Sequence, residues 1–257
     1  MRKIICMANQ KGGVGKTTTA INLSASLAAA EKRTLLVDCD SQGNATSGMG
    51  IDVRSIGEKN LYHSLIGKVP LGEVIVRTQI PHLELVPANQ DLIGIEVEFL
   101  QLDDREKRLR NLLRNLETVY DYIIIDCPPS LGFLTVNALV ASDYLVVPMQ
   151  CEYFAMEGLG HLLNTMRLVK TKLNPTLTLG GILLTMYDSR NLLSRRVCED
   201  VRGNFGDRVF QTVIPRNVRL SESPSHGLPI ILYDIKSRGA ISYMELANEI
   251  LSNGRMV

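Results

Sequence analysis

The sequence lacks any run of eighteen apolar residues, and this absence excludes a helix long enough to cross a membrane. It also lacks a C-x-x-C pair, since its five cysteines are scattered singly along the chain. An odd number of isolated cysteines favours reduced, buried thiols in a cytosolic protein over disulfides or a zinc site. An excess of one charge is missing as well, because 28 Lys and Arg against 27 Asp and Glu leave a net charge of +1. A polyanion partner would therefore need a local basic patch, or one completed by assembly.

Short apolar runs rich in Ile, Val and Leu are what the sequence does contain, and most of them end in a turn or polar residue. Such runs are typical of strands buried on both faces of a parallel sheet. The expected strands include residues 4–5, 35–37, 83–86, 123–125, 145–147, 182–184 and 213–214. Helical spacing separates them, at residues 16–30, in the leucines 109, 112, 113 and 116, and between residues 159 and 173.

This alternation of strands and helices predicts an α/β fold, a doubly wound and mostly parallel sheet covered by helices on both faces. Ligands bind such sheets at the carboxyl ends of the strands. The N-terminal segment enters the first strand directly and does not have the pattern of a signal peptide. No repeat, low-complexity segment or linker divides the chain, so we expect residues 1–257 to form a single P-loop ATPase domain.

A glycine-rich segment, NQKGGVGKTT at residues 9–18, follows the first expected strand and opens the first helix. In that context glycines let backbone N–H groups turn toward an anion, and the helix N-terminus adds partial positive charge. The segment therefore predicts a phosphate loop for ATP and Mg²⁺, with Gly12, Gly13 and Gly15 forming its turn. Lys16 would reach the β- and γ-phosphates, Thr17 would bind Mg²⁺, and Thr18 would approach the α-phosphate. A glycine-rich turn without a ligand explains this combination poorly.

Carboxylates end two of the expected strands. Alternation places Asp38 and Asp40 on one side of the chain, with Asp40 further out toward the γ-phosphate. We therefore expect Asp40 to orient the attacking water, and Asp38 to support the metal shell or the phosphate loop. Asp126 follows the second of these runs, III at residues 123–125, and in a sheet with a phosphate loop it is expected to hold Mg²⁺ through a water. Asp40 is expected to reach the metal in the same indirect way.

The phosphate loop departs from the usual pattern in one respect: Gln10 stands at the first glycine position and Lys11 follows it. Here the sequence resembles the deviant Walker A family, which includes ParA, MinD, the nitrogenase iron protein and the arsenite-pump ATPase. The resemblance implies that Lys11 reaches across a homodimer interface to the phosphates of the partner's ATP. Without it, Lys11 would be interpreted as a solvated lysine of the loop.

Within that family the chain most resembles the ParA/Soj partitioning ATPases, over essentially its whole length. The stretches that carry the resemblance are NQKGGVGKTTTAINL, LLVDCDSQGNATSGMG, YDYIIIDCPPSLGFLTVNAL, PMQCEYFAMEGL and VIPRNVRLSESPSHGLPIILYD. One departure is Ser41, where the family usually has proline; it leaves Asp40 in place. The start of the chain at the first strand corresponds to the short chromosomal type, and the resemblance places Pro215 and Asn217 against the adenine.

The resemblance also implies a function: an ATP-dependent dimer that binds double-stranded DNA without sequence preference and drives chromosome or plasmid segregation. A ParB-like activator would trigger hydrolysis, and the protein would be cytoplasmic and associated with the nucleoid. Late basic residues would supply the DNA contacts, with Arg190 and Arg219 at the matching positions. On composition alone, interleaved acids make a mixed, solvated face an equal competitor. No recognition helix is evident, so contacts to phosphates are expected.

Three rival functions are weighed against this one. A membrane-binding ATPase of the MinD type would need a basic amphipathic C-terminal helix, whereas residues 242–254 contain two glutamates and no lysine and predict a packed closing helix ended by Gly254. A redox ATPase with a bridging cluster would need cysteines that Cys127 does not match. An ATP-dependent ligase on the same fold would leave Lys11 and the late arginines unexplained.

Overall fold

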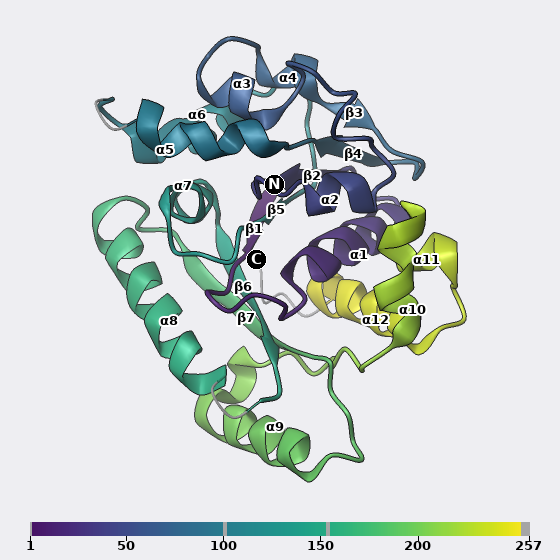
Figure 1. Ribbon diagram of the computed structural model, residues 1–257. Helices are drawn as coiled ribbons and strands as arrows, with labels where there is room; N and C mark the ends of the chain where they lie inside the picture. The colour runs from purple at the N-terminus through teal and green to yellow at the C-terminus, as the bar shows by residue number, and fades with distance from the viewer. Residues whose placement is uncertain (1, 100–101, 153–154, 253–257) are drawn as a thin grey trace.

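Seven strands form one sheet in the order β3-β4-β2-β5-β1-β6-β7 in the computed structural model of the chain, which describes residues 2–99, 102–152 and 155–252 (Figure 1). Every neighbouring pair is parallel except β3 and β4. The strands are β1 (Lys3–Met7), β2 (Thr34–Asp38), β3 (Val76–Arg77), β4 (Leu83–Val86), β5 (Tyr122–Asp126), β6 (Tyr144–Gln150) and β7 (Thr178–Thr185). The predicted doubly wound, mostly parallel sheet is confirmed.

Alternate residues of the central strands enter two separate hydrophobic cores, one on each face of the sheet. On β1, Ile4 and Cys6 belong to one core, and Ile5 and Met7 belong to the other. Since both faces are buried, a strand cannot carry polar residues at alternate positions, which explains the continuous apolar runs in the sequence.

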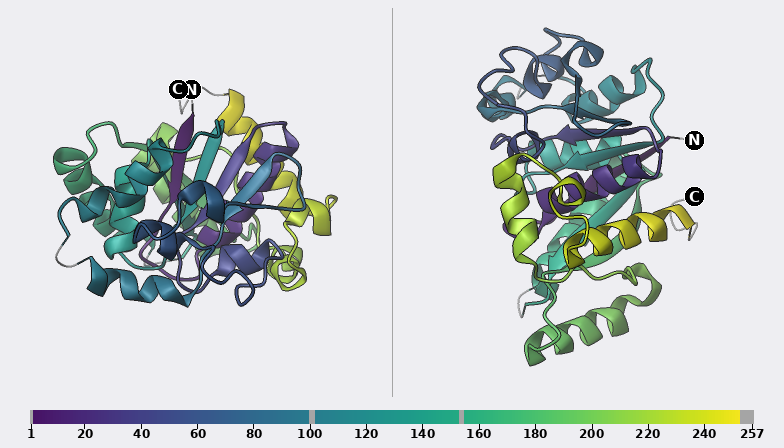
Figure 2. Two further views of the ribbon diagram at one scale, coloured as in Figure 1. Left: turned by 90° about the horizontal axis from the view of Figure 1, so that it is seen from above. Right: turned by 90° about the vertical axis from the view of Figure 1, so that its right-hand side faces the viewer.

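Helices cover both faces of the sheet, as the two views in Figure 2 show. Apolar residues of α1, α2 and α12 line one core, and those of α3 to α9 line the other. The helices are α1 (Lys16–Ala29), α2 (Asn44–Gly48), α3 (Leu61–Leu65), α4 (Leu71–Val74), α5 (Ile95–Glu98), α6 (Arg108–Arg114), α7 (Phe133–Ala141), α8 (Ala155–Lys172), α9 (Leu192–Phe205), α10 (Val218–Glu222), α11 (Ile230–Tyr233) and α12 (Arg238–Ser252). Short 3₁₀ turns are η1 (Gln90–Gly94), η2 (Arg105–Lys107), η3 (Gly206–Arg208) and η4 (Ser223–His226).

Residues 213–214 do not form a strand, so that prediction is wrong. The segment runs alongside the end of β7, where Ile214 N–H donates to Leu184 O at 2.9 Å and Tyr187 N–H donates to Ile214 O at 3.1 Å. The contact is limited to an isolated bridge between Tyr187 and Pro215, and it does not extend into a ladder. The two-residue edge strand β3 was not predicted, because it is too short to give an apolar run.

The closing segment forms the helix α12, as predicted, and Gly254 lies outside the described residues. This helix packs against α1 (Figure 1). Glu249, one of the two glutamates of the segment, is buried and accepts hydrogen bonds from Gln211 N–H at 2.8 Å and Thr212 N–H at 2.9 Å. Throughout the part of the chain that the structure describes, no helix combines the length and apolar character that crossing a bilayer requires.

Candidate nucleotide site

The predicted phosphate loop lies between the end of β1 at Met7 and the start of α1 at Lys16. Gly13 and Gly15 have φ angles of +72° and +87°, a left-handed conformation that glycine adopts without strain. Lys16 folds back over the loop, and its Nζ donates to Lys11 O at 3.3 Å. Its side chain is buried, so the ammonium is held in the loop and is not free in solvent.

Two side-chain hydrogen bonds fix this loop to neighbouring strands. Asn9 Nδ2 donates to Pro148 O on β6 at 2.8 Å, and Thr185 Oγ1 at the end of β7 donates to Val14 O at 2.8 Å. Asn9 also accepts from Lys11 N–H at 3.0 Å. Thr185 was not identified from the sequence, because a threonine at the end of a strand carries no distinguishing pattern.

Two buried carboxylates face the loop from adjacent strands. Asp38 and Asp126 are directly paired in the β2–β5 register, and both are fully buried. Neither oxygen of Asp126 has a hydrogen-bond partner of normal geometry among the described residues. Burial and the neighbouring charge of Asp38 raise the pKa of Asp126, and the Thr17 hydroxyl and Lys16 ammonium offset only part of that rise. Burial in turn lowers the pKa of Lys16, while the charges of Asp126 and Asp40 oppose that shift.

Asp38 and Asp40 differ in what they bind. Asp38 accepts from Thr46 Oγ1 at 2.7 Å, from Thr46 N–H at 2.8 Å and from Asp40 N–H at 3.1 Å, so all three bonds stabilise the turn that follows β2. The Asp40 carboxylate accepts a local bond in that turn, from Gln42 N–H at 3.0 Å. Asp38 thus anchors the segment that carries Asp40, an anchoring role that the sequence did not indicate.

Lys11 points away from the loop and pairs with Glu152, beyond the end of β6. The two side chains are 42% and 46% exposed, so the pair lies at the surface. The two lysines of the loop are therefore in different environments, with Lys16 inside and Lys11 outside. Glu152 was not identified from the sequence, since it is 141 positions away from Lys11.

A cavity of about 400 Å³ brings distant segments together beside the first turn of α1. Gly15 and Thr18 line it from the phosphate loop, and Pro215 and Asn217 line it from the segment before α10. The predicted adenine residues thus lie at one cavity with the predicted phosphate residues. Asn217 Oδ1 accepts from Leu220 N–H at 3.2 Å and caps α10, which leaves its amide hydrogens available. Tyr243 of α12, also in the lining, was not identified from the sequence.

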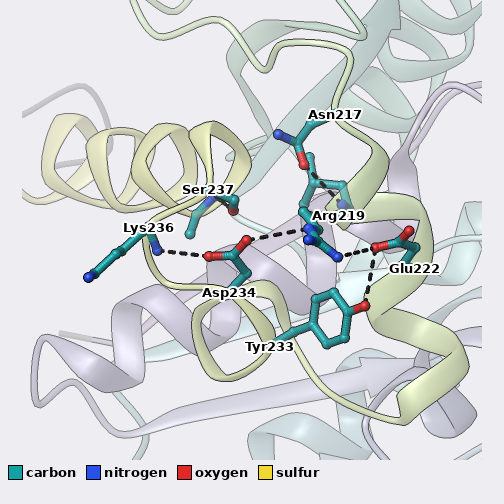
Figure 3. A network of polar contacts seen from close by, with 9 residues as sticks. Asn217, Arg219, Glu222, Tyr233, Asp234, Lys236 and Ser237 are labelled. Atoms are coloured by element: carbon teal, nitrogen blue, oxygen red, sulfur yellow. Dashed lines mark hydrogen bonds and ion pairs between the residues drawn. The ribbon is translucent and has the colours of Figure 1, made fainter.

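The two arginines predicted to bind DNA are exposed, but each is already in an ion pair. Arg190, 88% exposed, contacts Asp188 through Nε and Nη2, both at 3.0 Å. Arg219, 54% exposed, contacts Glu222 at 2.9 Å and Asp234 at 3.5 Å, and its guanidinium lies over the ring of Tyr233 (Figure 3). Their ion-pair partners are thus acids of nearby segments and not the buried carboxylates Asp38 and Asp126.

The donor groups at the loop fit a hydrated magnesium ion. In the described ranges, no three His, Cys, Asp or Glu side chains gather in a way that could hold a metal. Mg²⁺ needs no such cage, because it keeps several waters and is usually held by one or two carboxylates with the phosphates of the substrate. The buried oxygens of Asp126 next to the Thr17 hydroxyl supply that kind of partial shell.

Comparison with known proteins agrees with this geometry. A family model described as an AAA domain matches residues 2–179. The chromosome partitioning protein ParA of Myxococcus xanthus is 58% identical over 97% of this chain and 88% of its own length. The sporulation initiation inhibitor protein Soj of Bacillus subtilis is 55% identical over 99% of this chain and 100% of its own length. A solved structure of a protein named cobyrinic acid a,c-diamide synthase from Mycobacterium smegmatis, with bound ADP and magnesium, superposes with a TM-score of 0.87 at 39% identity, covering 99% of this chain and 96% of that one.

Proposed function

Because the chain belongs to the ParA/Soj family of chromosome-partitioning ATPases, we propose that it is a switch that ATP closes into a homodimer. The closed dimer binds double-stranded DNA without sequence preference. A ParB-like activator protein then triggers hydrolysis of ATP to ADP and phosphate, and the dimer opens and releases the DNA. Repeated cycles of this kind segregate a chromosome or plasmid, and they keep the protein in the cytoplasm at the nucleoid. In this proposal residues 1–257 act as one ATPase domain.

The observation that carries the ATPase part is that the carboxylate of Asp126, buried next to a phosphate loop, has no hydrogen-bond partner of normal geometry among the described residues. A buried carboxylate without a partner is costly, and a bound cation relieves that cost. When Mg²⁺ is bound with ATP, it neutralises charge on the phosphates. We assign Thr17 to the metal directly, and Asp126 and Asp40 to its waters.

The remaining residues of the site have separate roles in this proposal. Backbone N–H groups of Gly12, Gly13 and Gly15 surround the phosphates, Lys16 pairs with the β- and γ-phosphates, and Thr18 contacts the α-phosphate. Asp40 orients the water that attacks the γ-phosphate. The cavity between Thr18, Pro215 and Asn217 receives the adenine.

The different environments of the two lysines support the homodimer. Lys16 is buried in the loop, whereas Lys11 is at the surface and pairs with Glu152. An exposed ion pair contributes little free energy, so Lys11 is readily released to a stronger anion. The triphosphate held by a second copy of this chain is such an anion, and Lys11 of each copy then contacts the ATP of the other.

An ATP-dependent ligase is the other function to separate, because the similar Mycobacterium smegmatis protein is named as a synthase. Relatives with higher identity include chromosome partitioning proteins, and the surface position of Lys11 has no role in a ligase that works as a single chain.

The experiment that tests the proposal measures ATP turnover of the purified chain alone, with DNA, with a ParB-like protein from the same organism, and with both. We expect slow turnover by the chain alone and a rate with both additions that exceeds the sum of their separate effects. Turnover that neither addition changes would contradict the proposal.

A further inference from the structure

Each of the two arginines proposed to contact DNA is covered by a carboxylate on the edge of its guanidinium group. Asp188 occupies Nε and Nη2 of Arg190. Glu222 occupies Nη1 of Arg219, and Asp234 lies 3.5 Å from its Nε. Arginine binds a phosphate most strongly through two parallel N–H donors, so a phosphate that approached these edges would have to displace a carboxylate.

The polar contacts around Arg219 form a small network (Figure 3). Tyr233 Oη donates to Glu222 Oε2 at 3.1 Å and holds that carboxylate against the guanidinium. Asp234 is also held in place, since its Oδ1 accepts a hydrogen bond from Lys236 N–H at 3.2 Å. The helix that carries Arg219 is fixed at two points. Asn217 caps it, and the buried side chain of Leu220 packs closely on Gly239, where an added Cβ would lie only 2.6 Å from Leu220 Cγ.

We propose that Glu222, Asp234 and Asp188 compete with DNA phosphates for Arg219 and Arg190, and so limit the affinity of this surface for DNA. This inference rests on the DNA binding proposed above and adds the residues that regulate it. Glu222 and Asp234 each accept a further hydrogen bond that holds their negative charge near Arg219, so they repel an approaching polyanion even where it displaces their direct contacts. A single chain then offers too little free positive charge, and two chains must combine their arginines before DNA is held.

The alternative is that the acids align the guanidinium for DNA, as second partners do in many binding sites. The two interpretations predict opposite changes in DNA affinity when the acids are replaced by amides. If the acids compete, neutral amides in their place strengthen DNA binding; if they align Arg219, the same substitutions weaken it. The positions of the two acids favour competition. Glu222 contacts a nitrogen of the Nη1–Nη2 edge of Arg219, and Asp234 lies 3.5 Å from a nitrogen of its Nε–Nη2 edge, so a phosphate meets a carboxylate at either edge.

The decisive variants are Glu222→Gln, Asp234→Asn and Asp188→Asn, each of which removes one charge and keeps the shape of the side chain. Asp104→Asn is the matched control, since Asp104 pairs with Lys107 in an exposed i,i+3 contact like that of Arg219 with Glu222. Asp104 has a φ of +55°, which asparagine tolerates. Its substitution changes the net charge equally, away from both arginines.

Affinity is measured for a non-specific duplex with a non-hydrolysable ATP analogue over a salt series, and retention on heparin is measured as a second polyanion assay. Exposed pairs of this kind are weak, so we expect about twofold to fivefold tighter DNA binding for each variant near Arg219 or Arg190. Later elution from heparin is expected for the same variants, with no comparable change for Asp104→Asn. Unchanged or weaker binding, or an equal gain in the control, would overturn the inference.

The two assays also separate this inference from the proposed function. If the unsubstituted protein shows no ATP-dependent DNA binding, the proposed function fails. Later elution of Glu222→Gln from heparin would still support competition at Arg219, whereas unchanged elution would reject it. Tyr233→Phe, which removes only the hydroxyl that holds Glu222, is expected to increase DNA affinity and heparin retention less than Glu222→Gln does.

Discussion

The ammonium group of Lys11 forms an ion pair with the carboxylate of Glu152 in the same chain, at the rim of the phosphate loop. This contact connects the segment before α1 with the segment after β6, beside the bond from Asn9 to Pro148 O. Both partners are about half exposed, so water and salt weaken the pair. The ion pair with Glu152 therefore orients Lys11 within the chain but is weak enough to be broken when a stronger anion binds.

Replacing Lys11 with alanine is expected to remove the ATP-dependent dimer while leaving ATP binding by the single chain nearly intact. Only the contact with the partner's phosphates is lost, since Lys16 still serves the chain's own site. Losing a charge-assisted bond at each of two ATP sites should weaken dimerisation by at least about tenfold. Sedimentation with and without ATP measures this. Glu152→Gln is the control and should still dimerise; equal dimerisation by both variants would show that Lys11 has no role in assembly.

Lys16→Ala is expected to abolish measurable ATP binding. The substitution removes the cation nearest the phosphates and leaves the charges of Asp126 and Asp40 without their neighbour. Isothermal calorimetry measures the affinity, and Lys170→Ala on the exposed surface of α8 serves as the control. Near-native ATP affinity in Lys16→Ala would refute the assignment of this lysine to the phosphates.

Much of the fold and site could be predicted because the relevant signals are local in the sequence. The apolar runs of β1, β2 and β5 reflect burial on both faces, and the residue that ends or follows each run lies at the carboxyl edge of the sheet. Asp126 and the phosphate loop were therefore found together. Pro215 and Asn217 could be assigned to the nucleotide only by resemblance, since nothing near them in the sequence points to a cavity.

The contacts that could not be predicted join residues far apart in the chain. Glu152 meets Lys11 and Thr185 meets Val14 only after β6 and β7 have aligned beside β1. The failed strand at residues 213–214 has a similar cause, because an apolar pair can lie beside a strand without joining its ladder. The carboxylates on Arg190 and Arg219 were visible as interleaved acids, but only their geometry shows which edge they occupy.

Asp40→Ala is expected to keep ATP binding and dimerisation and to lower turnover by about a hundredfold, since only the transition state loses an oriented water. The ATP dimer should then accumulate. Asp40→Asn gives a cleaner comparison, because an amide oxygen can still accept from Gln42 N–H and preserve the turn. Single-turnover hydrolysis measures the chemical step. Native turnover in both variants would make Asp40 a structural residue.

Arg219→Glu and Arg190→Glu should keep the ATP dimer and lose DNA. Each reversal removes two phosphate contacts per dimer and adds repulsion, and the remaining affinity should depend less steeply on salt. Fluorescence anisotropy with an arbitrary duplex measures binding, and light scattering checks the dimer. Arg54→Glu, which also breaks an exposed ion pair, is the control. If both variants dimerise and still bind DNA at native strength, the DNA surface lies elsewhere.

Asp126→Asn is expected to stabilise the nucleotide-free chain at neutral pH while removing its stabilisation by Mg²⁺ and ATP. Burial raises the pKa of Asp126 in the folded chain, so the folded state binds more protons than the unfolded state between about pH 4, the ordinary pKa of aspartate, and neutrality. The free energy of unfolding of the native protein therefore falls as the pH rises through that interval. In Asp126→Asn the amide does not ionise, so this decrease does not occur.

Urea unfolding at several pH values measures the effect of Asp126→Asn, with and without Mg²⁺ and ATP. The variant should gain about 1–3 kcal/mol near pH 7 and little near pH 4, where the native carboxyl is itself protonated. Asp38 shares the raised pKa but accepts three hydrogen bonds, so Asp38→Asn should destabilise the chain and serves as the opposite control. A destabilised Asp126→Asn at pH 7 would mean that the carboxylate is paired within the apo protein. The buried charge would then give no reason to expect a cation at this position.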